Sequence, residues 1–144
     1  MLYLWIFGNN IEDAMGHVRF VIFYLLCGII AALGFALPNA HSQIPMVGAS
    51  GAISGALGAY LRLYPRAKVL VLIPLGFIAQ MVYLPAILVL GLWMVFQLLN
   101  TYLANPGQGG VAWGAHIGGF AAGVVLIPLF KNARHPLFGG GRRS

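Results

Sequence analysis

The sequence predicts an all-α membrane protein, a polytopic bundle of helices that crosses the bilayer several times. Of its 144 residues, 60% are hydrophobic and only 7% are charged, and the mean hydropathy is +0.89. An average soluble domain has about 25% charged residues. The charged residues also flank the long apolar runs, and apolar runs of roughly 20 residues are typical of membrane spans.

The apolar runs define the expected helices in chain order. Residues 1–7 are too short to span, so they are interpreted as the end of a helix, and residues 8–13 as a polar turn. Residues 18–37 form a long apolar run. After a loop rich in turn residues, the run over 50–64 has room for only about 22 Å of helix, at about 1.5 Å per residue. We therefore expect this short helix to begin below the membrane surface.

The second half of the chain predicts two more spans. Residues 69–77 are apolar but contain Pro74 and Gly76, so they are interpreted as an interfacial or re-entrant stretch, or as an extension of the next helix. Residues 85–103 form a full span, and residues 111–130 form the last one.

The basic residues predict the orientation. All eight flank apolar runs. If successive helices cross the membrane in opposite directions, every basic residue falls on the same side. By the positive-inside rule that side is cytoplasmic, and the net charge of +6 does not indicate a nucleic-acid partner. We expect a multi-pass protein of the bacterial cytoplasmic membrane, with a membrane domain over residues 1–130 and a basic, disordered cytoplasmic tail over residues 131–144. The eight residues are Arg19, Arg62, Arg66, Lys68, Lys131, Arg134, Arg142 and Arg143.

Ser50 and His116 are the candidate catalytic residues. Ser50 stands among glycines at the start of the short helix, where a hydroxyl is a poor packing choice, and His116 lies a few residues into the last span. Both helices enter from the outer side, so the two residues should lie at similar depth. A histidine within a span is costly and a functional candidate by default. Structural hydrogen bonding is the alternative for each of them.

The chemistry of the pair predicts a hydrolase. A serine becomes a useful nucleophile when a base takes its proton, and histidine is the usual base. Protease triads add a carboxylate, but the only acidic residues are Glu12 and Asp13, both predicted to be cytoplasmic. A hydrolase here would therefore use a Ser-His dyad. The backbone N–H of Ser50, at a helix N-terminus, is the expected oxyanion donor.

Small residues predict close contact between the two helices. Glycines spaced by four residues let membrane helices approach closely, which a short serine–histidine distance requires. Gln97 and Asn100, near the end of another span, could line a cavity or hydrogen-bond across helices, and packing is the favoured interpretation. The histidines, cysteine and carboxylates show no ligand spacing, so neither a metal nor any other cofactor is expected. The expected helix-packing residues are Gly51, Gly55, Gly58, Gly119 and Gly123.

Two motifs resemble those of the rhomboid intramembrane serine proteases. Gly48-Ala49-Ser50-Gly51 is similar to the family's G-x-S-G nucleophile motif. The stretch AHIGGFAAG, from Ala115 to Gly123, is similar to its A-H-x-x-G-x-x-x-G motif. Residues 4–8, followed by Glu12, look like the end of the family's second core helix. The resemblance covers nearly the whole chain.

The resemblance implies a six-helix core with a water-filled cavity open to the outer side, and cleavage of transmembrane protein substrates. It implies that Ser50 is the nucleophile and His116 the general base and acid. The family's H-x-x-x-N motif, which supplies further oxyanion donors, would fall just before Met1. The chain is therefore interpreted as an inactive or weakly active fragment that lacks the first helix and most of the second. Some members carry an aromatic residue where this chain has Ser54, so the packing of His116 is expected to differ.

Two other functions remain open. A rhomboid-like pseudoprotease would bind transmembrane clients without cutting them; the intact Ser50 and His116 argue against it, and the absent oxyanion motif argues for it. A small channel or transporter subunit would need ionisable residues along a path across the whole bilayer, and only His116 lies deep in a span. For protease and pseudoprotease alike, the expected partners are transmembrane proteins and the lipid bilayer.

Overall fold

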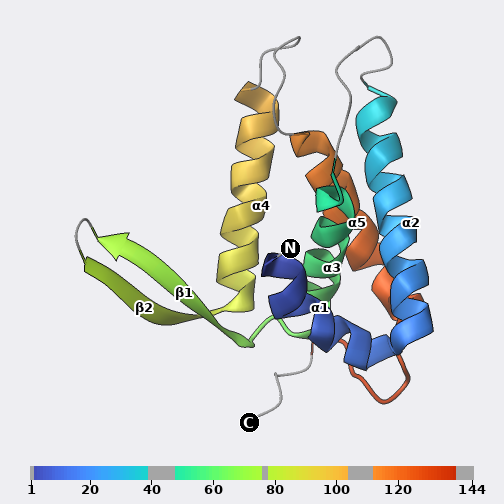
Figure 1. Ribbon diagram of the computed structural model, residues 1–144, viewed down its shortest axis with the longest axis horizontal. Coiled ribbons are helices and arrows are strands. Elements are labelled where there is room, and N and C mark those ends of the chain that lie inside the picture. Colours follow the sequence, from blue (N-terminus) through green and yellow to red (C-terminus); the bar gives the residue numbers. More distant parts are fainter. Residues whose placement is uncertain (1, 39–47, 76–77, 104–111, 139–144) are drawn as a thin grey trace.

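The computed structural model describes residues 2–38, 48–75, 78–103 and 112–138. Within these ranges the chain forms helices and one pair of strands (Figure 1). The helical class predicted from composition is confirmed. In chain order the elements are α1 (Leu2–Met15), α2 (His17–Ala36), α3 (Ser50–Leu63), β1 (Lys68–Leu75), β2 (Ile78–Pro85), α4 (Ala86–Leu103) and α5 (Trp113–Phe130).

Helix α3 forms the centre of the bundle. It packs against α5, α2, α1 and α4, and in Figure 1 the upright helices α2, α4 and α5 stand around it while α1 lies toward the lower end. Ten of the fourteen residues of α3 are buried, and seven of those ten are glycine, alanine or serine. Since it is enclosed by other helices, α3 needs no long lipid-facing run, and its small side chains let its neighbours come close.

Helices α2, α4 and α5 are long and apolar enough to cross a membrane. Large hydrophobic side chains remain exposed along them, among them Leu25, Ile29 and Leu92. Apolar surface of this extent marks contact with a membrane or a partner rather than with water. The three predicted full spans are confirmed to within two residues at each end.

The polar turn predicted at residues 8–13 is wrong, because α1 continues through it to Met15. Ile11 and Ala14 are buried in the core, and Asn10 Nδ2 donates to the Ile6 carbonyl at 3.4 Å. Burial of one helix face therefore outweighs the turn preference of the glycine and asparagines in this stretch.

The stretch after α3 forms the hairpin β1–β2, so it does not extend α4. Three β-branched residues, Val69, Val71 and Ile73, stand at every second position of β1, a spacing that favours a strand. Helix α4 begins at Ala86, directly after Pro85. The interfacial and re-entrant interpretations concern the place of this stretch in the membrane, which is considered below.

An arginine completes the hydrogen bonding of α5. In an α-helix the carbonyl of residue 124 accepts from the N–H of residue 128, but residue 128 is Pro128, which has no N–H. Arg62, in the last turn of α3, donates from Nη1 to the Val124 carbonyl at 2.6 Å. The guanidinium therefore replaces the donor that proline removes, and it joins the ends of α3 and α5.

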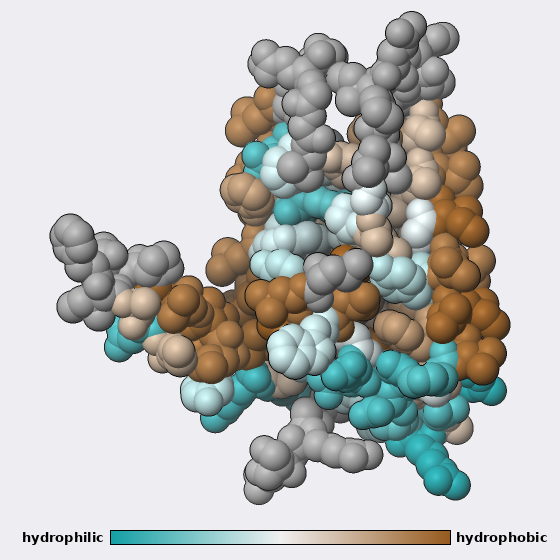
Figure 2. All heavy atoms as spheres, viewed as in Figure 1, coloured by the Kyte–Doolittle hydropathy of each residue, from teal (hydrophilic) through white to brown (hydrophobic). Residues whose placement is uncertain are grey.

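The basic residues of the described ranges gather at one end of the bundle. There α2 begins and α3 and α5 end, and Figure 2 shows hydrophilic side chains across this lower end. Residues 131–138 contact the same end: the Asn132 N–H donates to the Ala14 carbonyl at 2.8 Å, and the Phe138 N–H to the Arg62 carbonyl at 2.9 Å. Within the predicted tail, Asn132 and Phe138 are therefore hydrogen-bonded to the bundle, and residues 139–144 lie outside the described ranges.

Candidate active site

Ser50 and His116 stand on neighbouring turns of two helices in contact. Gly51, directly after Ser50, lies against α5: a Cβ atom at Gly51 would be 3.5 Å from the carbonyl oxygen of Ala115, which precedes His116. In turn, a Cβ atom at Gly119 would overlap the Gly51 carbonyl. The structure therefore brings the two candidate residues to the same level of the bundle.

All five predicted helix-packing glycines lie where helices meet. One turn below Gly51 and Gly119, a Cβ atom at Gly123 would overlap the carbonyl of Gly55, and one at Gly58 would overlap the carbonyl of Phe120. At these positions the backbones approach so closely that no side chain fits between them. The glycines therefore set the spacing of α3 and α5, and with it the separation of the serine and the histidine.

Ser50 is the first residue of α3 and is exposed. The first hydrogen bond at this end joins the Ile53 N–H to the Ala49 carbonyl at 3.0 Å, so the Ser50 N–H precedes the helical ladder. Gly48 turns the chain into α3 with a φ of +124°, a conformation that favours glycine. The start of α3 therefore presents a hydroxyl, an N–H group that the helix does not use and the positive end of the helix dipole.

His116 is buried, with 9% of its surface exposed. Its Nδ1 lies 2.7 Å from Oε1 of Gln97 on α4, and Gln97 is itself only 3% exposed. Because a carbonyl oxygen only accepts hydrogen bonds, Nδ1 carries the proton and donates it. Nε2 is then unprotonated and is the nitrogen that can act as a base.

Two tryptophans flank the imidazole. The ring centroid of Trp93 on α4 lies 6.0 Å from that of His116, and the ring of Trp113 on α5 lies 6.2 Å away in an edge orientation. The expected difference in packing on α3 is also visible, since Ser54 is buried and donates from Oγ to the Ser50 carbonyl at 2.8 Å. The aromatic neighbours of His116 thus come from α4 and α5.

Gln97 is the residue whose role the sequence did not disclose. Packing was the favoured interpretation of Gln97 and Asn100, but Gln97 follows the alternative, a hydrogen bond across helices, and its partner is His116. Asn100 bonds within its own helix, to the Phe96 carbonyl at 2.7 Å. The four-residue spacing of Trp93 and Gln97 puts both on one face of α4, but spacing alone does not say which face meets α5.

Within the described residues no hydrogen bond joins the Ser50 hydroxyl to His116. Catalytic hydrogen bonds are often long before a substrate binds, so this arrangement is compatible with a base and a nucleophile. The same residues contain no group of three histidine, cysteine, aspartate or glutamate side chains placed to bind a metal ion.

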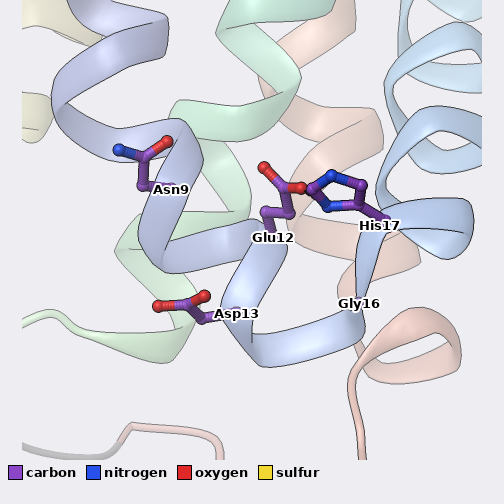
Figure 3. Close-up of a pocket in the computed structure, with 5 residues that line it drawn as sticks. All are labelled: Asn9, Glu12, Asp13, Gly16 and His17. Atoms are coloured by element: carbon purple, nitrogen blue, oxygen red, sulfur yellow. Dashed lines mark ion pairs between the residues drawn. The ribbon is translucent and has the colours of Figure 1, made fainter.

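The two acidic residues of the chain lie at the other end of the bundle, near the junction of α1 and α2. Glu12 pairs with His17 there, and in Figure 3 the Glu12 carboxylate points toward the His17 ring while Asp13 points away. His116 therefore has an amide as its hydrogen-bond partner and not a carboxylate. The small pocket at this junction is lined by Asn9, Glu12, Asp13, Gly16 and His17.

Comparison with known proteins matches residues 1–133 to the Rhomboid domain family. The chain is 33% identical over 135 residues to Rhomboid protein 1, mitochondrial, of Saccharomyces cerevisiae, which covers 87% of this chain and 35% of that protein. It is 32% identical over 125 residues to Rhomboid protease GluP of Bacillus subtilis, which covers 87% of this chain and 22% of that protein. The chain thus spans well under half the length of these relatives. No solved structure matches it significantly.

Proposed function

Because the chain belongs to the rhomboid family and is an integral membrane protein, we propose that it is an intramembrane serine endopeptidase that cleaves transmembrane segments of other membrane proteins. Ser50 is the nucleophile, and His116 is the general base and acid. The observation that carries the proposal is the contact of Gly51 with the turn of α5 that holds His116. That contact places a hydroxyl and an imidazole at one level, at the start of a helix.

In the proposed reaction, Nε2 of His116 takes the hydroxyl proton as Ser50 Oγ attacks the carbonyl carbon of the peptide bond. The resulting oxyanion is stabilised by the Ser50 N–H and the positive end of α3. His116 then gives the proton to the departing amine, which leaves an acyl group on Ser50. Water, deprotonated by the same Nε2, attacks this acyl group, and as the bond to Ser50 Oγ breaks, Nε2 returns the proton to Oγ. This step releases the carboxyl product and restores the Ser50 hydroxyl and the neutral His116.

We assign Gln97 a positioning role in this reaction. By accepting a hydrogen bond from Nδ1, it selects the tautomer in which Nε2 is the base. The rings of Trp93 and Trp113 restrict the orientation of the imidazole and shield it from water. Because the sequence predicts a dyad without a carboxylate, this hydrogen bond takes over the orienting part that a carboxylate has in protease triads.

The proposed orientation places the basic end of the bundle in the cytoplasm of a bacterial cell. The support is the clustering of arginine and lysine where α2 begins and where α3 and α5 end. Ser50 then begins its helix from the outer side, and transmembrane protein substrates reach it within that half of the bilayer.

Covalent labelling of the serine tests the proposal. The purified chain is treated in detergent with a fluorophosphonate probe, and the modified residue is identified by mass spectrometry. We expect labelling of Ser50 that is lost in Ser50→Ala and strongly reduced in His116→Ala. Ser54→Ala, which removes a hydroxyl one turn further along α3, should label like the parent chain. If no labelling depends on Ser50 and His116, the proposal that the chain is an enzyme is wrong.

The second candidate is a rhomboid-like pseudoprotease that binds transmembrane clients without cleaving them. The observation that favours it is that, within the described residues, no hydrogen bond joins the Ser50 hydroxyl to His116. Crosslinking of a transmembrane client that is equally efficient in the parent chain and in Ser50→Ala, without any labelling of Ser50, would favour the pseudoprotease.

A further inference from the structure

The hairpin β1–β2 projects sideways from the bundle beside the lower end of α4 (Figure 1). Its base is fixed, because the Ala86 N–H donates to the Ala67 carbonyl at 2.8 Å and the Ile87 N–H to the Pro65 carbonyl at 2.9 Å. Val69, at the start of β1, packs against the core. The hairpin therefore leaves the bundle at a defined place and in a defined direction.

One face of the hairpin is apolar and exposed. In the antiparallel register Leu70 lies opposite Tyr83, and Leu72 lies opposite Met81. Side chains that are opposite in register share a face. These four are 49%, 66%, 57% and 67% exposed, respectively. In Figure 2 the part of the hairpin next to the helices is largely brown, with some hydrophilic side chains on the same arm.

The other face is also mainly apolar. Val69, Val71 and Val82 lie on it and are half-buried, and Gln80, opposite Ile73, is exposed there. A two-stranded hairpin is at best marginally stable in water, and exposed apolar patches favour association. An aqueous location therefore does not suit the hairpin.

The hydrocarbon interior of the bilayer does not suit it either. Each strand of a two-stranded sheet has one edge whose N–H and C=O groups have no strand partner. Lipid chains provide no hydrogen-bond partner, so open sheet edges do not occur within the hydrocarbon core. A boundary layer that offers acyl chains on one side and water and head groups on the other satisfies both the side chains and the edges.

The charges around the hairpin fit such a boundary. Arg66 and Lys68 are exposed at its base, at the end of the bundle where the other basic residues gather. Lysine and arginine near a membrane surface are attracted by anionic head groups. In the first turn of α4, directly after the hairpin, Ile87 and Leu88 are also 52% and 51% exposed.

We propose that the hairpin β1–β2 is an interfacial membrane anchor. It lies at the level of the head groups in the leaflet on the basic side, with Leu70, Leu72, Met81 and Tyr83 against the acyl chains. Arg66 and Lys68 contact anionic head groups. The partner is the lipid surface itself, and the inference does not depend on whether Ser50 is catalytic.

Depth-dependent quenching of a fluorescent label tests the anchor. A nitrobenzoxadiazole label is attached to Leu72→Cys or Met81→Cys in a Cys27→Ala background, and the full chain is reconstituted into phosphatidylcholine–phosphatidylglycerol vesicles. Nitroxides sit either near the head groups or deep in the acyl chains. We expect stronger quenching by the shallow nitroxide at both hairpin positions. A label at Leu92→Cys, which is 67% exposed midway along α4, is the control that should respond more to the deep nitroxide.

Each other outcome contradicts the anchor in a recognisable way. Stronger quenching by the deep nitroxide at position 72 would make the hairpin re-entrant. No quenching by either nitroxide would place it in water. If labelled chains quench one another, and this self-quenching disappears on dilution with unlabelled chains, the hairpin contacts a second copy of the chain and not the lipid surface. A final comparison tests the two charges. Phosphatidylglycerol, an anionic lipid, should increase the quenching by the shallow nitroxide, and the double variant Arg66→Gln, Lys68→Gln should show no such increase. If the double variant shows the same increase, Arg66 and Lys68 do not bind the head groups.

Discussion

A single buried hydrogen bond decides which nitrogen of His116 is the base. The imidazole is within hydrogen-bond distance of Gln97 through Nδ1, and both side chains are almost fully buried. A buried polar group without a partner is costly, so the amide and the ring stabilise each other. Fixing the proton on Nδ1 also fixes Nε2 as the acceptor.

Replacing Gln97 should therefore slow Ser50 labelling without unfolding the protein. Gln97→Met fills a similar volume but removes the acceptor, and a lost hydrogen bond of about 1 kcal/mol corresponds to a rate reduced roughly 5-fold. Gln97→Glu restores an acceptor and should recover much of the rate. The measurement is the rate of fluorophosphonate labelling, with thermal unfolding in detergent as the check on folding.

Asn100→Leu is the matched control, because Asn100 also carries an amide on α4 but bonds only within that helix. It should label at the parent rate. If Gln97→Met also labels at the parent rate, Gln97 is a packing residue and the positioning role is wrong.

The sequence predicted some of the candidate residues and not others. Ser50 and His116 could be predicted because each is chemically unusual within its own segment: a hydroxyl at an apolar helix start and an imidazole within a span. The contact of Gln97 with His116 could not be predicted, because it depends on the rotation of α4 relative to α5. That rotation follows from packing between segments, which local periodicity does not specify.

At the level of the elements, the separation of α3 and α5 depends on backbone contact. Gly119→Ala should lower the free energy of unfolding by about 1–3 kcal/mol, because the new methyl group would overlap the Gly51 carbonyl. It should also slow Ser50 labelling, since the helices that carry the serine and the histidine are pushed apart. Thermal unfolding and labelling are measured on the same preparation.

The control for that substitution lies on the same helix. A Cβ atom at Gly114 would meet nothing within 4 Å, so Gly114→Ala should leave stability unchanged or slightly increased. Equal effects of Gly114→Ala and Gly119→Ala would mean that helix propensity, and not close contact, governs the result.

Arg62 and Pro128 should behave as a coupled pair. Arg62→Leu leaves the Val124 carbonyl without its donor, so it should lower the free energy of unfolding by about 1–3 kcal/mol. In a Pro128→Ala background the alanine supplies an N–H to the same carbonyl, and Arg62→Leu should then cost less. A double-mutant cycle measured by thermal unfolding gives the coupling.

Arg66→Leu provides the comparison for this cycle, since Arg66 is exposed and should change stability by no more than about 0.5 kcal/mol. If Arg62→Leu lowers the free energy of unfolding equally in the two backgrounds, the guanidinium does not act through the Val124 carbonyl.

Two stretches show where local sequence was insufficient. The stretch at residues 8–13 has turn-forming residues, yet it is helical, with Ile11 and Ala14 buried in the core and α1 packed on α3 and α2. There, contacts distant in sequence outweigh the local preference. In the hairpin, β-branched residues alternate along β1, but the length and apolarity of the stretch also fit a membrane-inserted segment, so the sequence left several structures open.

At the scale of the whole molecule, the start of α3 and the basic residues of the described ranges lie at opposite ends of the bundle. The orientation of the bundle in the membrane therefore decides from which side a substrate reaches Ser50 and its N–H group, the proposed oxyanion donor.

The charge distribution predicts which side of the membrane the serine faces. Arginine and lysine are found where α2 begins and where α3 and α5 end, and cytoplasmic retention of such residues sets the orientation of multi-pass proteins. Tyr102, 89% exposed near the other end of α4, should then face outward together with the start of α3. In a Cys27→Ala background, Tyr102→Cys should react with an impermeant maleimide in intact bacteria, and Arg134→Cys should react only after permeabilisation. The reverse pattern would place Ser50 on the cytoplasmic side, and substrates would then have to enter from that leaflet.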